Sequence, residues 1–162
     1  MNALPIIAAL LLQASPDPAA LADFAESADE VEISLVRFTT AELDDPSGEA
    51  LKLVERSPIR KLSRKDAGEV SALVAGLARG EKPEPKRCIF NPDLRLTFKK
   101  GTESVQAVFC FSCSDVLIHR SGDKASGVWR GFAQHEAALQ ALVARIYSDL
   151  PEKKRKLGRG HD

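Results

Sequence analysis

Three absences limit what this sequence encodes. The apolar run of residues 3–12 is too short to cross a bilayer, which takes about 20 residues, so no stable membrane insertion is expected. The formal net charge is zero, and no basic segment carries interleaved aromatic residues, so we predict no nucleic-acid binding. No internal repeat is present, and 162 residues with 44% hydrophobic and only 6% aromatic content suit one compact domain plus tails.

The N-terminus has the features of an export signal. Residues 3–12 suit its apolar region, Ala20-Leu21-Ala22 supplies a small-x-small cleavage pattern, and Leu12-Gln13-Ala14 supplies a poorer, earlier one. No Lys or Arg precedes the run, and a buried segment of a cytoplasmic protein is the alternative. No cysteine directly follows the apolar run, so a lipoprotein anchor is not indicated. We predict a signal peptide over residues 1–22 and a periplasmic or secreted protein.

Charge is distributed unevenly along the chain. Residues 1–50 carry one basic residue, Arg37, against ten acidic ones, whereas residues 51–162 carry twenty-two basic against thirteen acidic. We expect the two parts to neutralise each other within one fold. The basic end, residues 151–162, is predicted to be a disordered tail, because such ends are usually solvated.

Apolar periodicity predicts three helices and about five strands. Helical spacing is clearest over residues 63–80, with shorter helices over residues 17–28 and 132–150, the last ended by Pro151. Alternation indicates strands at residues 31–38, 50–56, 88–98, 105–113 and 115–120, and residues 128–132 are a candidate last strand. This order gives an α+β fold, a single domain over residues 23–150, with an antiparallel sheet and helices packed on one face.

All three cysteines fall in the predicted hairpin of residues 88–113. A two-residue turn at Lys100-Gly101 sets Cys88 opposite Cys113, whereas one at Gly101-Thr102 sets Lys100 against Glu103 and Cys113 on the diagonal from Cys88. Both registers place Cys88 and Cys113 on the core face of the sheet. Cys110 then points to the opposite face unless a bulge intervenes.

This placement ranks the uses of the C-x-x-C pair formed by Cys110 and Cys113. A redox pair needs a helix N-terminus and a zinc site needs a tight turn, and Phe111-Ser112, without Gly or Pro, supplies neither. We therefore favour a Cys88–Cys113 disulfide worth roughly 3 kcal/mol, with Cys110 as a free thiol. Two alternatives stay open: pairing of Cys88 with Cys110 through an irregularity at Pro92, and a zinc site.

The zinc alternative uses Cys88, Cys110, Cys113 and His119, and requires a bulge in the second strand. A catalytic arrangement of Cys110, His119 and Asp115 has the right residue types, but nothing in their order brings them together. Trp129 is expected to be a core residue that closes the sheet.

Cys88-Ile-Phe-Asn-Pro92, the apolar strand after it, and Cys110-Phe-Ser-Cys113 followed by a helix resemble a group of bacterial proteins, many of them exported. These share a C-x-F-x-P and C-F-x-C core and have no established activity, and the resemblance covers about the C-terminal half of the chain. It implies a similar fold and a similar use of the three cysteines. Some members have P-R-H after the first cysteine where this chain has Pro92-Asp93-Leu94, which removes a histidine that could serve in catalysis or metal binding.

These observations predict an exported domain with a structural or binding role, a protein partner among its candidate ligands, and no catalysis. The alternative, from a different class, is a cysteine-based metal-binding or thiol-reactive protein in which Cys110 is the working group.

Overall fold

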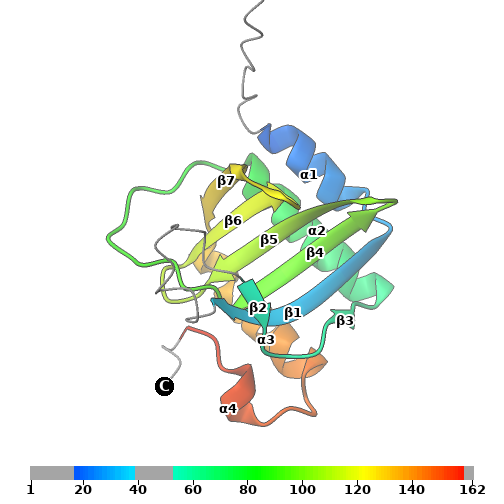
Figure 1. Ribbon diagram of the computed structural model, residues 1–162, viewed down its shortest axis with the longest axis vertical. Coiled ribbons are helices and arrows are strands. Elements are labelled where there is room, and N and C mark those ends of the chain that lie inside the picture. Colours follow the sequence, from blue (N-terminus) through cyan, green and yellow to red (C-terminus); the bar gives the residue numbers. More distant parts are fainter. Residues whose placement is uncertain (1–16, 39–52, 159–162) are drawn as a thin grey trace, which may run out of the picture.

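Alternating apolar residues form a seven-stranded antiparallel sheet in the computed structural model, which describes residues 17–38 and 53–158 (Figure 1). The strands are β1 (Glu30–Phe38), β2 (Leu53–Glu55), β3 (Arg60–Lys61), β4 (Leu94–Lys100), β5 (Glu103–Cys110), β6 (Asp115–Arg120) and β7 (Asp123–Gly131). Their order is β2-β1-β4-β5-β6-β7, and β3 also pairs with β1. The predicted α+β class is confirmed. The short strand β2 lies within the strand predicted at residues 50–56, and β3 is an additional short strand that was not predicted.

The helical elements are α1 (Pro18–Glu26), α2 (Arg64–Arg79), the 3₁₀ turn η1 (Ala133–His135), α3 (Glu136–Ile146) and α4 (Glu152–Arg155). Two of the helices, α1 and α2, begin at side chains that cap them. Asp17 caps α1 by accepting hydrogen bonds from the amides of Ala19 and Ala20. Ser63 caps α2 by accepting one from the amide of Asp66. No helix within residues 17–38 and 53–158 is long and apolar enough to cross a membrane.

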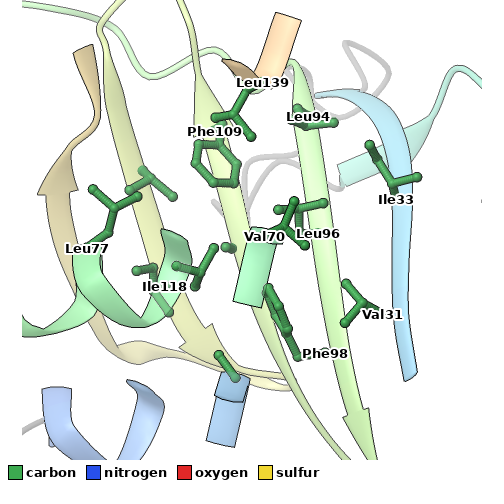
Figure 2. Packing of buried hydrophobic residues seen from close by; sticks show 14 of the residues in the cluster. Val31, Ile33, Val70, Leu77, Leu94, Leu96, Phe98, Phe109, Ile118 and Leu139 are labelled. Atoms are coloured by element: carbon green, nitrogen blue, oxygen red, sulfur yellow. The ribbon is translucent and has the colours of Figure 1, made fainter. Parts of the chain in front are cut away.

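One face of the sheet packs against the helices to form the core. Ile33, Leu96 and Ile118 alternate inward from different strands and meet Val70 of α2 in a continuous buried cluster (Figure 2). The same alternation sends the intervening residues of each strand to the opposite face. The helices therefore cover one side of the sheet, as the sequence predicted.

The first helix bears on the predicted signal peptide. Leu21 and Ala22 of α1 are 3% and 0% exposed and belong to the core cluster. Cleavage after Ala22 would cut α1 before Asp23 and remove buried apolar residues from the fold. The predicted boundary at residue 22 therefore falls inside a packed helix, whereas the earlier cleavage pattern ending at Ala14 lies outside the described residues.

The C-terminal residues that the structure describes are part of the fold. After α4, Arg56 Nη2 donates a hydrogen bond to the Lys156 carbonyl oxygen, and the Gly158 amide donates one to Asp93 Oδ1. Leu157 packs against the core cluster. The predicted disordered tail of residues 151–162 is therefore wrong up to Gly158, and residues 159–162 lie outside the described part of the chain.

The central hairpin takes the second of the two predicted registers, with Lys100 paired to Glu103. Its strands are shorter than alternation suggested, because β4 begins at Leu94 and β5 ends at Cys110. Pro92 has no amide hydrogen to offer a neighbouring strand, which explains why the ladder does not extend further back. The last strand differs in the other direction, since β7 begins at Asp123 rather than at residue 128.

Candidate functional site

The connection from α2 to β4, residues 80–93, contains no helix or strand and is drawn in green at the left of Figure 1. Irregular connections of this length in compact domains are usually either functional or flexible linkers. We call this segment the 80–93 loop. Its contacts fasten it to the rest of the domain, which favours a functional loop over a flexible linker.

A disulfide joins the 80–93 loop to the sheet. Cys88 is exposed within the loop, and Cys113 is 6% exposed in the turn of residues 111–114 between β5 and β6. Their Cα atoms are 5.8 Å apart. The prediction that both cysteines lie on the core face is wrong, because Cys88 precedes β4 and Cys113 follows β5. The disulfide thus fastens a surface loop to a turn.

Two further contacts fix the same loop near the same turn. Lys86 Nζ donates hydrogen bonds to the Cys113 carbonyl oxygen at 3.0 Å and to Asp115 Oδ1 at 3.1 Å. The Phe90 ring meets the Trp129 ring edge-on, with centroids 4.9 Å apart. The loop is therefore held by a covalent bond, an ion pair and an aromatic contact.

Asp93, at the end of the loop, is a buried residue that sequence reasoning did not identify. It is 2% exposed, and its Oδ2 accepts a hydrogen bond from the Phe111 amide at 3.0 Å. Its own amide donates to the Phe109 carbonyl oxygen at 2.8 Å. The departure from P-R-H at this position thus places a carboxylate where it orients the turn that carries Cys113. An acidic residue directly before an apolar strand is the only sequence signal for this role.

Cys110 carries the free thiol and is fully buried. It stands outside the core cluster, and its sulfur accepts a hydrogen bond from the Asn91 amide at 3.3 Å and lies 3.2 Å from Ser112 Oγ. The 80–93 loop therefore covers Cys110 on the side of the sheet away from the helices. Cys113 Sγ contacts the same loop, 3.3 Å from the Ile89 carbonyl oxygen.

The zinc set proposed from the sequence is not assembled. The sulfurs of Cys88 and Cys113 are bonded to each other, and His119 pairs with Gln106 at the far end of β6. Within the described residues, no group of three or more His, Cys, Asp or Glu side chains is arranged to hold a metal ion. The zinc alternative is therefore wrong.

The Cys110, His119 and Asp115 arrangement is not formed either. Asp115 pairs with Cys110 across the strands, but its carboxylate binds Lys86. His119 lies four residues further along β6, about 13 Å away at the usual rise of an antiparallel strand. Its Nδ1 is 2.7 Å from the Arg120 carbonyl oxygen.

A cavity of about 370 Å³ lies between the 80–93 loop, the end of α2, the end of β7 and η1. Lys82 and Lys86 line it from the loop, and Arg130 lines it from β7. Trp129 is 40% exposed, so the expectation that it closes the core is wrong, and its neighbour Arg130, at 9% exposed, is the buried member of the pair. Adjacent residues of β7 point to opposite faces of the sheet, which is why Arg130 is buried while Trp129 is exposed.

A larger cavity, of about 570 Å³, lies between α1, α2 and β1. Among its charged lining residues, Lys61 binds Glu30 and Glu26 binds Arg79 at 2.8 Å, whereas Asp29 and Arg64 form no ion pair within the described residues. The lining otherwise includes small side chains such as Ala67 and Ser71. This cavity is therefore lined by charges of both signs, in contrast to the mainly basic lining of the one beneath the 80–93 loop.

Comparison with known proteins identifies no relative: no family model matches the chain, and neither a curated protein nor a solved structure matches it. The site must accordingly be interpreted from its own geometry.

Proposed function

We propose that the protein is a binding module of an oxidising compartment and that the 80–93 loop is its binding element. The observation that carries this proposal is the position of the disulfide. It does not cross-link core strands, but fastens an irregular surface loop to a turn. A fixed loop loses less conformational entropy on binding than a mobile one, so such fastening favours recognition.

The side chains on the loop are those of a contact surface rather than of a catalytic centre. Ile89, next to the disulfide, is 89% exposed, and Trp129 beside Phe90 is 40% exposed. Exposed aromatic residues are enriched at interaction sites, and Ile89 adds apolar area beside them. The 80–93 loop also lines the neighbouring cavity, which adds a charged recess at the end of α2.

The disulfide is consistent with export, because structural disulfides persist in oxidising compartments. The fold adds a constraint on processing, since α1 packs from Leu21 onward. We propose that processing occurs at the earlier pattern, after Ala14, which leaves the whole of α1 in the mature protein. Processing after Ala22 is the outcome that would contradict the packed helix.

The test is an NMR screen of the oxidised protein against a library of small polar and aromatic molecules. We expect amide shifts on the 80–93 loop and at the Trp129 indole. The matched variant is Cys88→Ser with Cys113→Ser in a Cys110→Ser background, compared with Cys110→Ser alone. The proposal predicts weaker binding in the variant without the disulfide. Shifts confined to the cavity between α1 and α2, or equal affinity in both proteins, would overturn it.

A second candidate function, thiol exchange, is favoured by the turn of residues 111–114. Cys110 ends β5 immediately before the turn that holds Cys113, and both sulfurs contact residues 89–91 of the loop. The Cys110 thiolate would attack Cys113 Sγ, the Cys88–Cys113 bond would break, and Cys88 would leave as a thiolate that takes up the proton released by Cys110. No external oxidant is required for this exchange.

Peptide mapping after incubation with catalytic amounts of glutathione tests this second candidate. A Cys110–Cys113 disulfide with an alkylatable Cys88 would support it. An unchanged Cys88–Cys113 bond under the same conditions would leave Cys110 without a chemical role.

A further inference from the structure

We propose that the cavity beneath the 80–93 loop binds a small molecule through an oxoanion group, a carboxylate or a phosphate, held by Arg130. This inference rests on the proposed function, since one wall of the cavity belongs to the 80–93 loop, and it names the ligand class of that binding element. The cavity, at about 370 Å³, is within the range of small-molecule sites.

Arg130 is a buried cation, and the part of the chain that the structure describes holds no carboxylate partner for it. It is 9% exposed, and burial lowers the pKa of its guanidinium from the ordinary value. Arg130 forms no salt bridge to any carboxylate of the described ranges, residues 17–38 and 53–158. A buried charge is costly unless it is paired, so an anion in the cavity would relieve the cost.

The hydrogen bonds of Arg130 leave donors for such a ligand. Nε and Nη2 donate to the Ala78 carbonyl oxygen at 3.2 and 2.9 Å, and Nη1 donates to the Trp129 carbonyl oxygen at 2.8 Å. A guanidinium has five N–H groups, so each terminal nitrogen keeps one N–H that these carbonyls do not use. Two N–H groups on adjacent nitrogens suit the two oxygens of a carboxylate or phosphate.

The bonds to Ala78 also cap the C-terminal end of α2, and this capping by itself accounts for part of the placement of Arg130. It does not account for the other residues around the cavity. Lys82 lines it and has no ion-pair partner among the residues that the structure describes. Lys86 also lines the cavity but is paired with Asp115, and Glu81 is the acidic residue of the described lining. Arg130 and Lys82 together still leave this lining with a net positive charge.

The start of η1 forms the opposite wall. Ala133 and Gln134 line the cavity there, so their amide signals report on a molecule bound in it.

The experiment is a ¹H–¹⁵N NMR titration of the oxidised full chain with inorganic phosphate and, separately, with acetate, at an ionic strength held constant with chloride. We expect a saturable shift of the Arg130 Nε–Hε signal and of the amides of Ala133 and Gln134. Saturation by phosphate but not acetate identifies a phosphate-bearing ligand, and the reverse identifies a carboxylate. Absence of a saturable Arg130 shift with either probe overturns the proposal.

Variants separate the site from general charge effects. Arg130→Gln, which retains a donor for Ala78, should weaken binding at least about tenfold, and Lys82→Ala should weaken it by up to about fivefold. Lys65→Ala removes one exposed charge at the other end of α2 and should leave the affinity unchanged. If Arg130→Gln does not fold, the test relies on the Arg130 signal of the wild-type protein and on the anion affinities of Lys82→Ala and Lys65→Ala. Equal affinities in these two variants overturn the proposal.

The variant that lacks the disulfide distinguishes the two proposals. Anion binding that is unchanged by Cys88→Ser with Cys113→Ser supports the cavity and contradicts the role given to the fastened loop. Absence of anion binding in the oxidised protein overturns the cavity proposal, and the ligand screen then judges the loop on its own.

Discussion

Removing the disulfide should destabilise the protein mainly through its unfolded state. Cys88 and Cys113 are 25 positions apart, and on the chain-entropy relation a cross-link of this span is worth about 3.5 kcal/mol at 25 °C. Cys88 is exposed, so replacing it with Ser opens no core cavity, and Cys113, although 6% exposed, lies in a turn outside the core cluster. The folded loop also keeps the Lys86 ion pair and the Phe90 contact with Trp129. The folded structure should therefore survive.

Urea unfolding of Cys110→Ser and of the triple variant Cys88→Ser, Cys110→Ser, Cys113→Ser measures this contribution without thiol exchange. With a slope of about 1.5 kcal/mol per molar urea, the midpoint should fall by about 2 M, and the slope should rise because the unfolded chain is less compact. The near-ultraviolet circular dichroism of the folded protein should change little. A loss below about 1 kcal/mol, or a collapse of the aromatic signal, would refute the account of a fastened loop on an independently stable sheet.

Three further predictions concern the frame that carries the site. The Arg145 guanidinium and the Ser63 hydroxyl hold the pKa of Asp66 below its ordinary value. The contribution of these contacts to folding stability is therefore complete above about pH 4, and it is lost as the pH falls through the lower pKa of the folded state. Asp66→Asn should cost about 1–2 kcal/mol at pH 7 and flatten the acid limb of the stability curve, measured by urea unfolding at pH 7 and pH 3; an unchanged acid limb would contradict this. A Cβ at Gly127 would lie 2.6 Å from Leu117 Cδ1, so Gly127→Ala should destabilise the protein by about 1–3 kcal/mol. A Cβ at Gly76 in α2 would meet nothing within 4 Å, so Gly76→Ala should stabilise the protein by up to about 1 kcal/mol. Thermal unfolding compares the two variants, and shifts of the same sign in both would contradict this packing. Tyr147 is fully buried with its hydroxyl 2.8 Å from the Ile33 carbonyl oxygen, so Tyr147→Phe should cost about 1–2 kcal/mol by chemical unfolding, and a neutral substitution would show that this hydrogen bond contributes nothing.

Local patterns predicted most of the fold. The predicted starts at residues 17 and 63 coincide with the caps Asp17 and Ser63, whose short polar side chains satisfy free helix amides. One of the two predicted hairpin registers was correct, since the pairing of Lys100 with Glu103 follows from where the turn falls. Alternation also placed the core-facing residues of the sheet.

The site was less predictable, because it depends on where alternation stops. Cys88 and Cys113 continue the parity of the two strands, yet both lie outside them, in a loop and a turn. The turn depends on the buried Asp93 carboxylate, which comes from a different segment of the chain. Trp129, and not Arg130, is the residue that the sequence predicts to be buried. Sequence alone does not show which face of an edge strand the end of a helix will contact.

The most direct test of the account is intact-mass analysis with thiol alkylation and peptide mapping on protein isolated from its native host. The account predicts a Cys88–Cys113 cross-link, a single thiol at Cys110 that reacts only after unfolding, and an N-terminus that retains all of α1. Three free thiols, or an N-terminus at Asp23, would contradict it.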